Sequence, residues 1–131
     1  MTPQNDWRKQ LLVVDDDAAC REALVEFFRR EGFSVRFAAD GNEAFELFRA
    51  GRVDFSVMDV HMPGMSGLEV LQRLSTECGV HRVPPTILMS SDPTAGALTR
   101  TLFGLKVDFV PKPVRLDALR RSIRLLLRTD P

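Results

Sequence analysis

Five reactive side chains stand at or just after the ends of short apolar runs. Asp15 and Asp16 follow QLLVV, Asp59 ends DFSVMD, Ser90 ends TILMS, and Lys112 follows DFVP. Clustered carboxylates repel one another, and a hard divalent cation such as Mg²⁺, which prefers oxygen ligands, offsets that repulsion. A lysine ammonium and a hydroxyl nearby suit the oxygens of a phosphoryl group. A carboxylate in such surroundings can act as a nucleophile and take up phosphate as an aspartyl phosphate.

These side chains can act together only if the apolar runs lie side by side in one sheet. Five runs are predicted to be strands, at residues 10–14, 34–38, 54–60, 86–90 and 107–110. Helical spacing of apolar residues follows each one, at 18–31, 41–50, 66–76, 95–103 and 115–128. Five strand–helix units with short connections predict a doubly wound five-stranded parallel sheet with helices on both faces. Ligands bind beyond the carboxyl ends of such strands, where the five side chains are expected to meet.

Local signals predict where helices begin and which faces they bury. Asp17 stands where an N-cap belongs, so we assign it to the first helix rather than to the metal. Ser66, with Glu69 three residues later, makes a capping-box pattern. The fourth helix is expected to be weak, because it contains Gly96, Thr99 and Thr101. The last helix is expected to bury one apolar stripe, formed by Leu116, Leu119, Ile123 and Leu126.

The composition limits the classes of function. The chain has 131 residues, of which 44% are hydrophobic, as expected for one globular domain. Because 18 basic residues balance 18 acidic ones, no overall field attracts nucleic acid or an anionic membrane. No apolar run is long enough to span a bilayer, and MTPQNDWRKQ lacks a secretory core. We therefore expect a cytoplasmic protein in which Cys20 and Cys78 are reduced thiols.

Four motifs of the chain resemble those of the response-regulator receiver domain of two-component systems. They are LLVVDDD, VMDVHMPGMSG, TILMSS and DFVPKP, which occur in that family's order and at its usual separations. The resemblance covers residues 10–128 and leaves 1–9 as an N-terminal arm and 129–131 as a C-terminal tail. It implies a CheY-like, flavodoxin-like (βα)5 fold with strand order 2-1-3-4-5. It also implies a signalling switch that catalyses only its own phosphorylation and dephosphorylation and is not otherwise an enzyme.

The resemblance implies a role for each acid. Asp59 accepts the phosphoryl group from a sensor histidine kinase or a histidine phosphotransfer protein. Asp16 and Asp59 bind Mg²⁺ directly, with Mn²⁺ as a possible substitute. Asp15 acts largely through water, and the backbone carbonyl of His61 completes the shell.

The resemblance also implies how the phosphoryl group is stabilised and read. Ser90 and Lys112 contact it, and Phe109 occupies the aromatic switch position of the surface formed by helix 4, strand 5 and helix 5. Phe109 lacks the hydroxyl of the tyrosine found in many relatives, so its switching rests on packing alone. His61 and Asp92 flank the path of the attacking water and are expected to tune the phosphoryl lifetime. The proline after Lys112 implies a cis peptide bond.

Three alternative functions fit the sequence less well. Asp15 and Asp17 form the DxD of a haloacid-dehalogenase-like phosphatase, but Ala19 replaces that family's usual Thr or Val and no cap-sized insertion is present. A flavin-binding module would need a phosphate-cradling loop after the first strand, where these acids repel phosphate. A receiver that only docks is disfavoured, because every reaction residue is present.

The partners are predicted only in part. Neither His61 nor His81 is expected to donate phosphate, because such a donor normally lies on an exposed helix of a bundle. The arginines of the last helix are expected to form a solvated face, with a docking surface for an acidic partner as the alternative: Arg115, Arg120, Arg121, Arg124 and Arg128. A phosphorylation-dependent dimer stays open, and the downstream effector is not specified. Because the pattern fills the sequence, we expect a single-domain regulator or the receiver portion of a longer protein.

Overall fold

A computed structural model describes residues 8–92, 94–98, 102 and 104–127 of the chain, and strands alternate with helices along it. The strands are β1 (Gln10–Val14), β2 (Ser34–Ala38), β3 (Phe55–Asp59), β4 (Thr86–Ser90) and β5 (Val107–Pro111). The helices are α1 (Ala18–Arg30), α2 (Gly41–Ala50), α3 (Gly67–Cys78), α4 (Ala95–Leu98) and α5 (Leu116–Leu126). A short 3-10 helix, η2 (Val80–Arg82), follows α3. The predicted strands and helices are therefore confirmed within the described residues, with shifts of a few residues at some ends; most of the predicted fourth helix after Leu98 lies outside the described residues.

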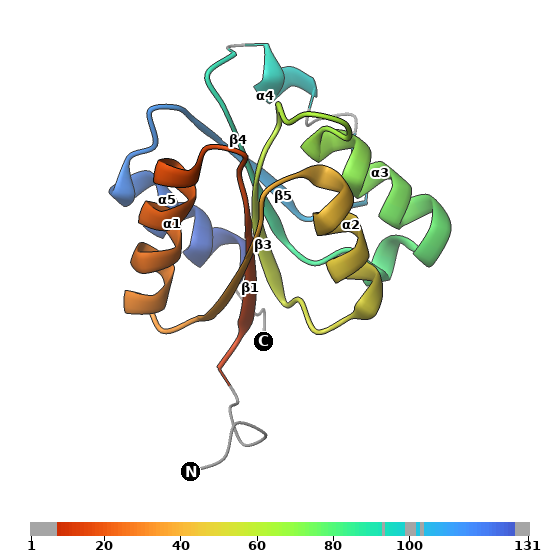
Figure 1. The fold of residues 1–131 in the computed structure, drawn as a ribbon, viewed down its shortest axis with the longest axis horizontal. Coiled ribbons are helices and arrows are strands. Elements are labelled where there is room, and N and C mark those ends of the chain that lie inside the picture. The colour runs from red at the N-terminus through yellow and green to blue at the C-terminus, as the bar shows by residue number, and fades with distance from the viewer. Residues whose placement is uncertain (1–7, 93, 99–101, 103, 128–131) are drawn as a thin grey trace.

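The five strands form one parallel sheet in the order β2-β1-β3-β4-β5, as predicted. Figure 1 shows the sheet nearly edge-on, with α1 and α5 on one side and α2 and α3 on the other. In the sheet register, Asp59 lies opposite Met89 on β4, and Ser90 lies opposite Pro111 on β5. The carboxyl ends of these three strands therefore lie side by side. Pro111 is tolerated because β5 is an edge strand.

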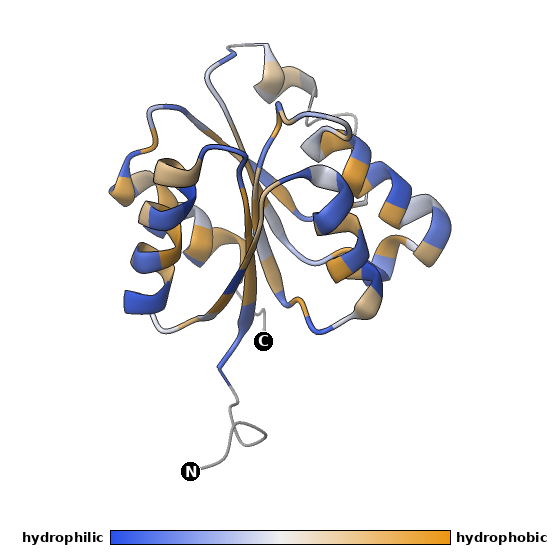
Figure 2. Ribbon diagram, in the orientation of Figure 1, coloured by the Kyte–Doolittle hydropathy of each residue, from blue (hydrophilic) through white to orange (hydrophobic). Residues whose placement is uncertain are grey.

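Two hydrophobic cores hold the helices against the sheet. One contains Phe28 of α1 and Leu119 of α5, and the other contains Phe45 of α2 and Leu71 of α3. Figure 2 shows apolar segments concentrated where the helices face the sheet. Every residue of β3 and β4 is buried, because helices cover both faces of these central strands. The strand that carries Asp59 is thus fixed from both sides.

The predicted helix caps are confirmed. The Asp17 carboxylate accepts hydrogen bonds from the amides of Ala19 and Cys20, at 3.0 and 3.3 Å. In the capping box, the Glu69 amide donates to Ser66 Oγ at 3.1 Å, and the Ser66 amide donates to Glu69 Oε1 at 3.0 Å. Asp17 therefore stabilises the start of α1, as its assignment to the helix requires.

The buried stripe of α5 was predicted wrongly at one position. Leu116 is 51% exposed, whereas Leu119, Ser122 and Leu126 are buried. Leu116 lies on the same helix face as the partly buried Ile123, seven residues later, but it is the first residue of α5 and lies outside the part of the helix that packs on the core. Ser122 is buried at low cost because its hydroxyl donates to Asp108 Oδ2 on β5 at 2.6 Å.

Some predicted features fall partly or wholly outside the described residues. These are the N-terminal arm up to Trp7, Thr99 and Thr101 of the fourth helix, Arg128, and the C-terminal tail. The four remaining arginines of the last helix are exposed, as expected, and Arg120 also pairs with Glu31, the C-cap residue of α1, at 3.2 Å. Both cysteines are free thiols. Within the described chain, no helix is long and apolar enough to cross a membrane.

Candidate functional site

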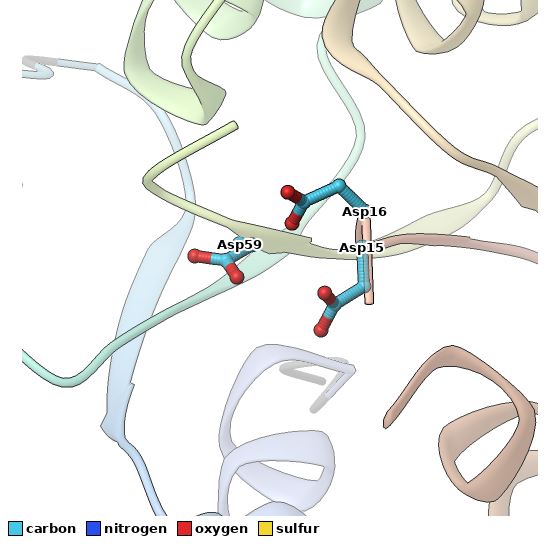
Figure 3. A group of neighbouring side chains, drawn as sticks. All are labelled: Asp15, Asp16 and Asp59. Carbon is cyan, nitrogen blue, oxygen red and sulfur yellow. The ribbon is translucent and has the colours of Figure 1, made fainter. Parts of the chain in front are cut away.

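Three aspartates meet at the carboxyl ends of two neighbouring strands. Asp15 and Asp16 directly follow β1, and Asp59 is the last residue of β3 (Figure 3). One carboxylate oxygen from each side chain lies within 4.8 Å of the others. Asp15 is fully buried and Asp59 nearly so, whereas Asp16 is exposed. The predicted acidic cluster therefore forms, with one member facing solvent.

Lys112 lies directly against this cluster. Its ammonium donates to Asp59 Oδ2 at 2.7 Å and to Asp15 Oδ2 at 3.2 Å. Partial burial alone would lower the pKa of the lysine, but the hydrogen bonds and charges of the two carboxylates outweigh it, so the net pKa of Lys112 is raised. Lys112 thus stays protonated at neutral pH and offsets the repulsion between the two buried acids.

The remaining oxygens of the two buried acids are held by backbone amides. Asp15 Oδ1 accepts from the Asp17 amide, and Asp59 Oδ1 accepts from the His61 amide, each at 3.0 Å. Within the described part of the chain, no hydrogen bond or ion pair engages the Asp16 carboxylate. These hard oxygen donors fit Mg²⁺ or Mn²⁺, and the exposure of Asp16 leaves room for the waters that Mg²⁺ retains.

Ser90, His61 and Asp92 lie on the loops beside the cluster. Ser90 is buried at the end of β4, and its hydroxyl oxygen accepts from the Asp92 amide at 2.9 Å. The Asp92 carboxylate is 3.8 Å from His61 Nε2. Hydrogen bonds from the Thr94 amide and hydroxyl lower the pKa of Asp92, and the charge of His61 contributes to this shift. His61 and Asp92 therefore face each other across the two loops that follow β3 and β4.

Phe109 is half-buried on β5 and packs against the second core. A Cβ atom on Gly96 of α4 would lie 3.2 Å from Cδ2 of the Phe109 ring, so the ring rests against the backbone of this helix. The peptide bond between Lys112 and Pro113 is cis, as predicted. Phe109 thus lies on β5, and Lys112 directly follows that strand.

Two glycines that let the end of β3 and the loop after it approach α2 and α3 closely were not predicted. A Cβ atom on Gly67, the first residue of α3, would lie 2.6 Å from the Asp59 carbonyl oxygen. A Cβ atom on Gly41, the first residue of α2, would overlap the carbonyl group of Met65. The sequence did carry a signal for them, because each glycine directly follows a helix N-cap residue. The backbone there needs no conformation that favours glycine, so a close approach of another segment is the reason that remains for its presence.

Gly67→Ala is expected to lower the free energy of unfolding by about 1–3 kcal/mol, because the backbone at Asp59 must move to admit the methyl group. Urea denaturation followed by circular dichroism would measure the change. Gly96→Ala is the matched control, since the three atoms nearest its methyl group would all belong to the Phe109 side chain rather than to backbone. Equal stability of Gly67→Ala and wild type would contradict this close approach.

Cys20 lies near the site without being reactive. Burial, followed by its hydrogen bond and electrostatic interaction with Asp15, raises the pKa of the thiol to about 12. The nucleophilic thiolate is therefore scarce at neutral pH.

Sequence relatives of the chain are response regulators. The family model of the response regulator receiver domain matches residues 11–124. Response regulator MprA of Mycolicibacterium vanbaalenii is 38% identical over 122 residues, which cover 91% of this chain and 50% of that protein. Response regulator MprA of Mycobacterium tuberculosis H37Rv is 36% identical over 119 residues, with the same coverage. The chain therefore spans about half the length of these curated relatives.

Solved structures of similar fold are receiver domains and response regulators. A putative response regulator from Chloroflexus aurantiacus superposes with a TM-score of 0.82 at 26% identity, covering 93% of this chain and 99% of that one. CheY4 of Vibrio cholerae gives 0.79 at 24% identity, covering 92% and 99%. The receiver domain of Saccharomyces cerevisiae Ssk1, crystallised with the histidine phosphotransfer protein Ypd1, gives 0.76 at 22% identity, covering 91% and 88%. Because the family model matches residues 11–124, most of the chain, the chain belongs to the response regulator receiver domain family.

Proposed function

We propose that Asp59 is the residue on which this receiver is phosphorylated, in a Mg²⁺-dependent reaction. The family consists of signalling switches, and the observation that carries the assignment is the position of Asp59. It ends β3 within the acidic cluster, and the Lys112 ammonium is 2.7 Å from its Oδ2 atom. A carboxylate with a cation at this distance has a partner ready for the oxygens of an incoming phosphoryl group.

Each neighbouring residue has a distinct role in this proposal. The Asp59 carboxylate attacks phosphorus as the bond to the donor's leaving group breaks, and Lys112 moves its hydrogen bond to a phosphoryl oxygen. The Ser90 hydroxyl, whose oxygen accepts from Asp92, keeps its own hydrogen to donate to another phosphoryl oxygen. Bound Mg²⁺ supplies neutralisation of the phosphoryl charge. Asp16 and Asp59, with the carbonyl of His61, would hold the ion, while Asp15 acts through water.

The donor is proposed to be a histidine kinase or a histidine phosphotransfer protein, acting in the cytoplasm. The complex of the Ssk1 receiver with Ypd1 supports a phosphotransfer partner for a domain of this fold. The receiver would catalyse its own phosphorylation and dephosphorylation and no other turnover. The phosphorylated receiver would then act on a downstream partner or output domain.

Incubation with acetyl phosphate and Mg²⁺ tests the proposal. Mass spectrometry of the intact protein is expected to detect one added phosphoryl group per chain, stable in acid and labile in base. Chelation of Mg²⁺ is expected to prevent the modification. Modification that proceeds equally well in excess EDTA would contradict the metal dependence.

His61 and Asp92 are proposed to tune the lifetime of the phosphorylated state. The two side chains are exposed, at 59% and 42%, and face each other where water can approach Asp59. His61→Ala and Asp92→Ala are each expected to change the dephosphorylation rate several-fold, measured by loss of the label. Glu77→Ala is the control, because it breaks a comparable exposed pair with Arg73 on α3. Unchanged lifetimes in both His61 and Asp92 variants would remove the pair from this role.

The output surface is proposed to be the face formed by α4, β5 and α5. In the described part of α4, the contact with Phe109 is made through Gly96. A glycine within a helix lowers its stability, so this helix is inexpensive to displace. A phosphoryl group that draws in the Ser90 hydroxyl and Lys112 would leave space for the Phe109 ring. Phosphorylation can shift this balance only by binding the two packings differently.

Ser90→Ala is expected to accept phosphate yet to lose most of the conformational response at this surface. Amide NMR spectra with and without beryllofluoride, a phosphoryl mimic, would measure the response. In the wild type, large shifts are expected for Gly96, Phe109 and the Arg120–Arg124 segment. Shifts confined to the loops around Asp59 would contradict the proposed output surface.

A further inference from the structure

Arg21 joins the first turn of α1 to the acidic loop that precedes it. Its Nη1 atom donates to the backbone carbonyl oxygen of Asp15 at 2.8 Å, in a partly buried position. Its guanidinium carbon lies 5.4 Å from the centre of the Phe37 ring on β2. The side chain is therefore held at two points, by a backbone hydrogen bond and by an aromatic face.

The carbonyl group that Arg21 binds belongs to the peptide group between Asp15 and Asp16. The Asp15 carboxylate is already fixed on both oxygens, by the Asp17 amide and by Lys112. Within the described residues, the Asp16 carboxylate has no such partner. The direction in which Asp16 leaves the backbone therefore depends on the plane of this peptide group, which the hydrogen bond from Arg21 fixes.

The same contact gives a reason for an exposed aromatic residue. Phe37 is 53% exposed, although it lies on a strand whose apolar residues are otherwise largely buried. The ring provides a flat surface for the guanidinium and limits its freedom to turn away from Asp15. The three residues thus form a connected path from the β2 edge to the acidic loop.

We propose that Arg21 is a positioning residue for the Mg²⁺ site, because its hydrogen bond to the Asp15 carbonyl orients the Asp16 carboxylate. The inference rests on the proposed Mg²⁺-dependent function and adds a residue outside the ligand set. Groups that orient metal ligands through hydrogen bonds typically change metal affinity by about 10–100-fold when they are removed.

The direction of the change in Mg²⁺ affinity distinguishes a positioning role of Arg21 from a purely electrostatic one. Arg21 carries a positive charge close to the cation site, so loss of that charge alone would strengthen Mg²⁺ binding. Loss of the hydrogen bond would weaken binding, because the Asp16 carboxylate would no longer be held in place. Arg21→Met removes both the charge and the donor while it keeps an apolar chain over Phe37.

Isothermal titration calorimetry with MgCl2 on the unphosphorylated full chain tests the inference. Arg21→Met is expected to bind Mg²⁺ about tenfold more weakly than wild type. Arg29→Met, which removes a positive charge from the last turn of the same helix, is the matched control and is expected to bind as tightly as wild type. Thermal melting in EDTA checks that both variants are folded. If Arg21→Met does not melt cooperatively, Arg21→Lys replaces it. Weaker Mg²⁺ binding is again expected, because an ammonium group cannot donate to the Asp15 carbonyl and stack on the Phe37 ring at the same time as the planar guanidinium does.

Arg21→Met binding of Mg²⁺ equal to or tighter than wild type would overturn the positioning role while leaving the proposed function intact. Equal weakening in Arg21→Met and Arg29→Met would overturn it as well, because the effect would then not depend on the Asp15 carbonyl. A wild-type chain that binds no Mg²⁺ would overturn both this inference and the metal-dependent function.

Discussion

Asp59→Asn is expected to abolish covalent phosphorylation by acetyl phosphate or by a phosphorylated histidine donor. The amide is nearly the same size as the carboxylate, but it carries no charge and is a far weaker nucleophile toward phosphorus. Lys112 would keep only Asp15 as a carboxylate partner at the 3.2 Å contact. Intact-mass measurement after incubation with the donor and Mg²⁺ should find no added phosphoryl group.

Asp117→Asn is the control for this experiment. Asp117 is an exposed carboxylate in the first turn of α5 and pairs with Arg115 at 3.3 Å, outside the acidic cluster. Its substitution is expected to leave phosphorylation unchanged. Phosphoryl label that persists on the Asp59→Asn protein would mean that another residue is the nucleophile.

Asp16→Ala is expected to weaken Mg²⁺ binding by on the order of tenfold or more. Asp16 is the exposed member of the cluster, and no other described group engages its carboxylate, so its oxygens are free for an ion. The other two acids are already engaged by Lys112 and by backbone amides. Loss of the free carboxylate removes a direct ligand and one negative charge from the site. Calorimetric titration with MgCl2 would measure the change.

The adjacent substitution, Asp17→Ala, is expected to affect stability rather than Mg²⁺ binding. Its carboxylate caps α1 through the amides of Ala19 and Cys20, so the substitution is expected to lower the free energy of unfolding by about 1 kcal/mol. Mg²⁺ binding should be retained. If Asp16→Ala binds Mg²⁺ like wild type and Asp17→Ala does not, the roles of these two neighbouring aspartates are reversed.

Lys112 changes the explanation for how the buried acids are tolerated. From the sequence, a divalent cation was expected to offset the repulsion between the aspartates. In the structure, Lys112 is within hydrogen-bond distance of both Asp15 and Asp59, and its raised pKa keeps it charged. The buried acids are therefore paired without an ion, which leaves the exposed Asp16 as the carboxylate most directly available to Mg²⁺.

The sequence by itself determined the strands, the helix caps and the edge of the sheet at which the reactive residues meet. These features depend on neighbours in the chain: apolar runs of five residues, Asp17 or Ser66 just before a helix, and a carboxylate at the end of β3. Periodicity and capping act over a few residues, so their signals are visible in the sequence. Parallel strands joined by right-handed crossovers then bring Asp59 close to Asp15 and Asp16.

Only the tertiary structure decided where the buried face of α5 begins, which polar residue it includes and what supports the acidic loop. Leu116, at the start of the helix, is exposed, whereas Ser122 is buried because β5 supplies Asp108 as a partner for its hydroxyl. Gly67 approaches the Asp59 carbonyl, and Arg21 donates to the Asp15 carbonyl. Every residue carries the same backbone carbonyl group, so the amino-acid sequence does not indicate which carbonyl groups take part in such contacts. Contacts to them follow from how the packed helices meet the strand ends, which is a property of the folded chain.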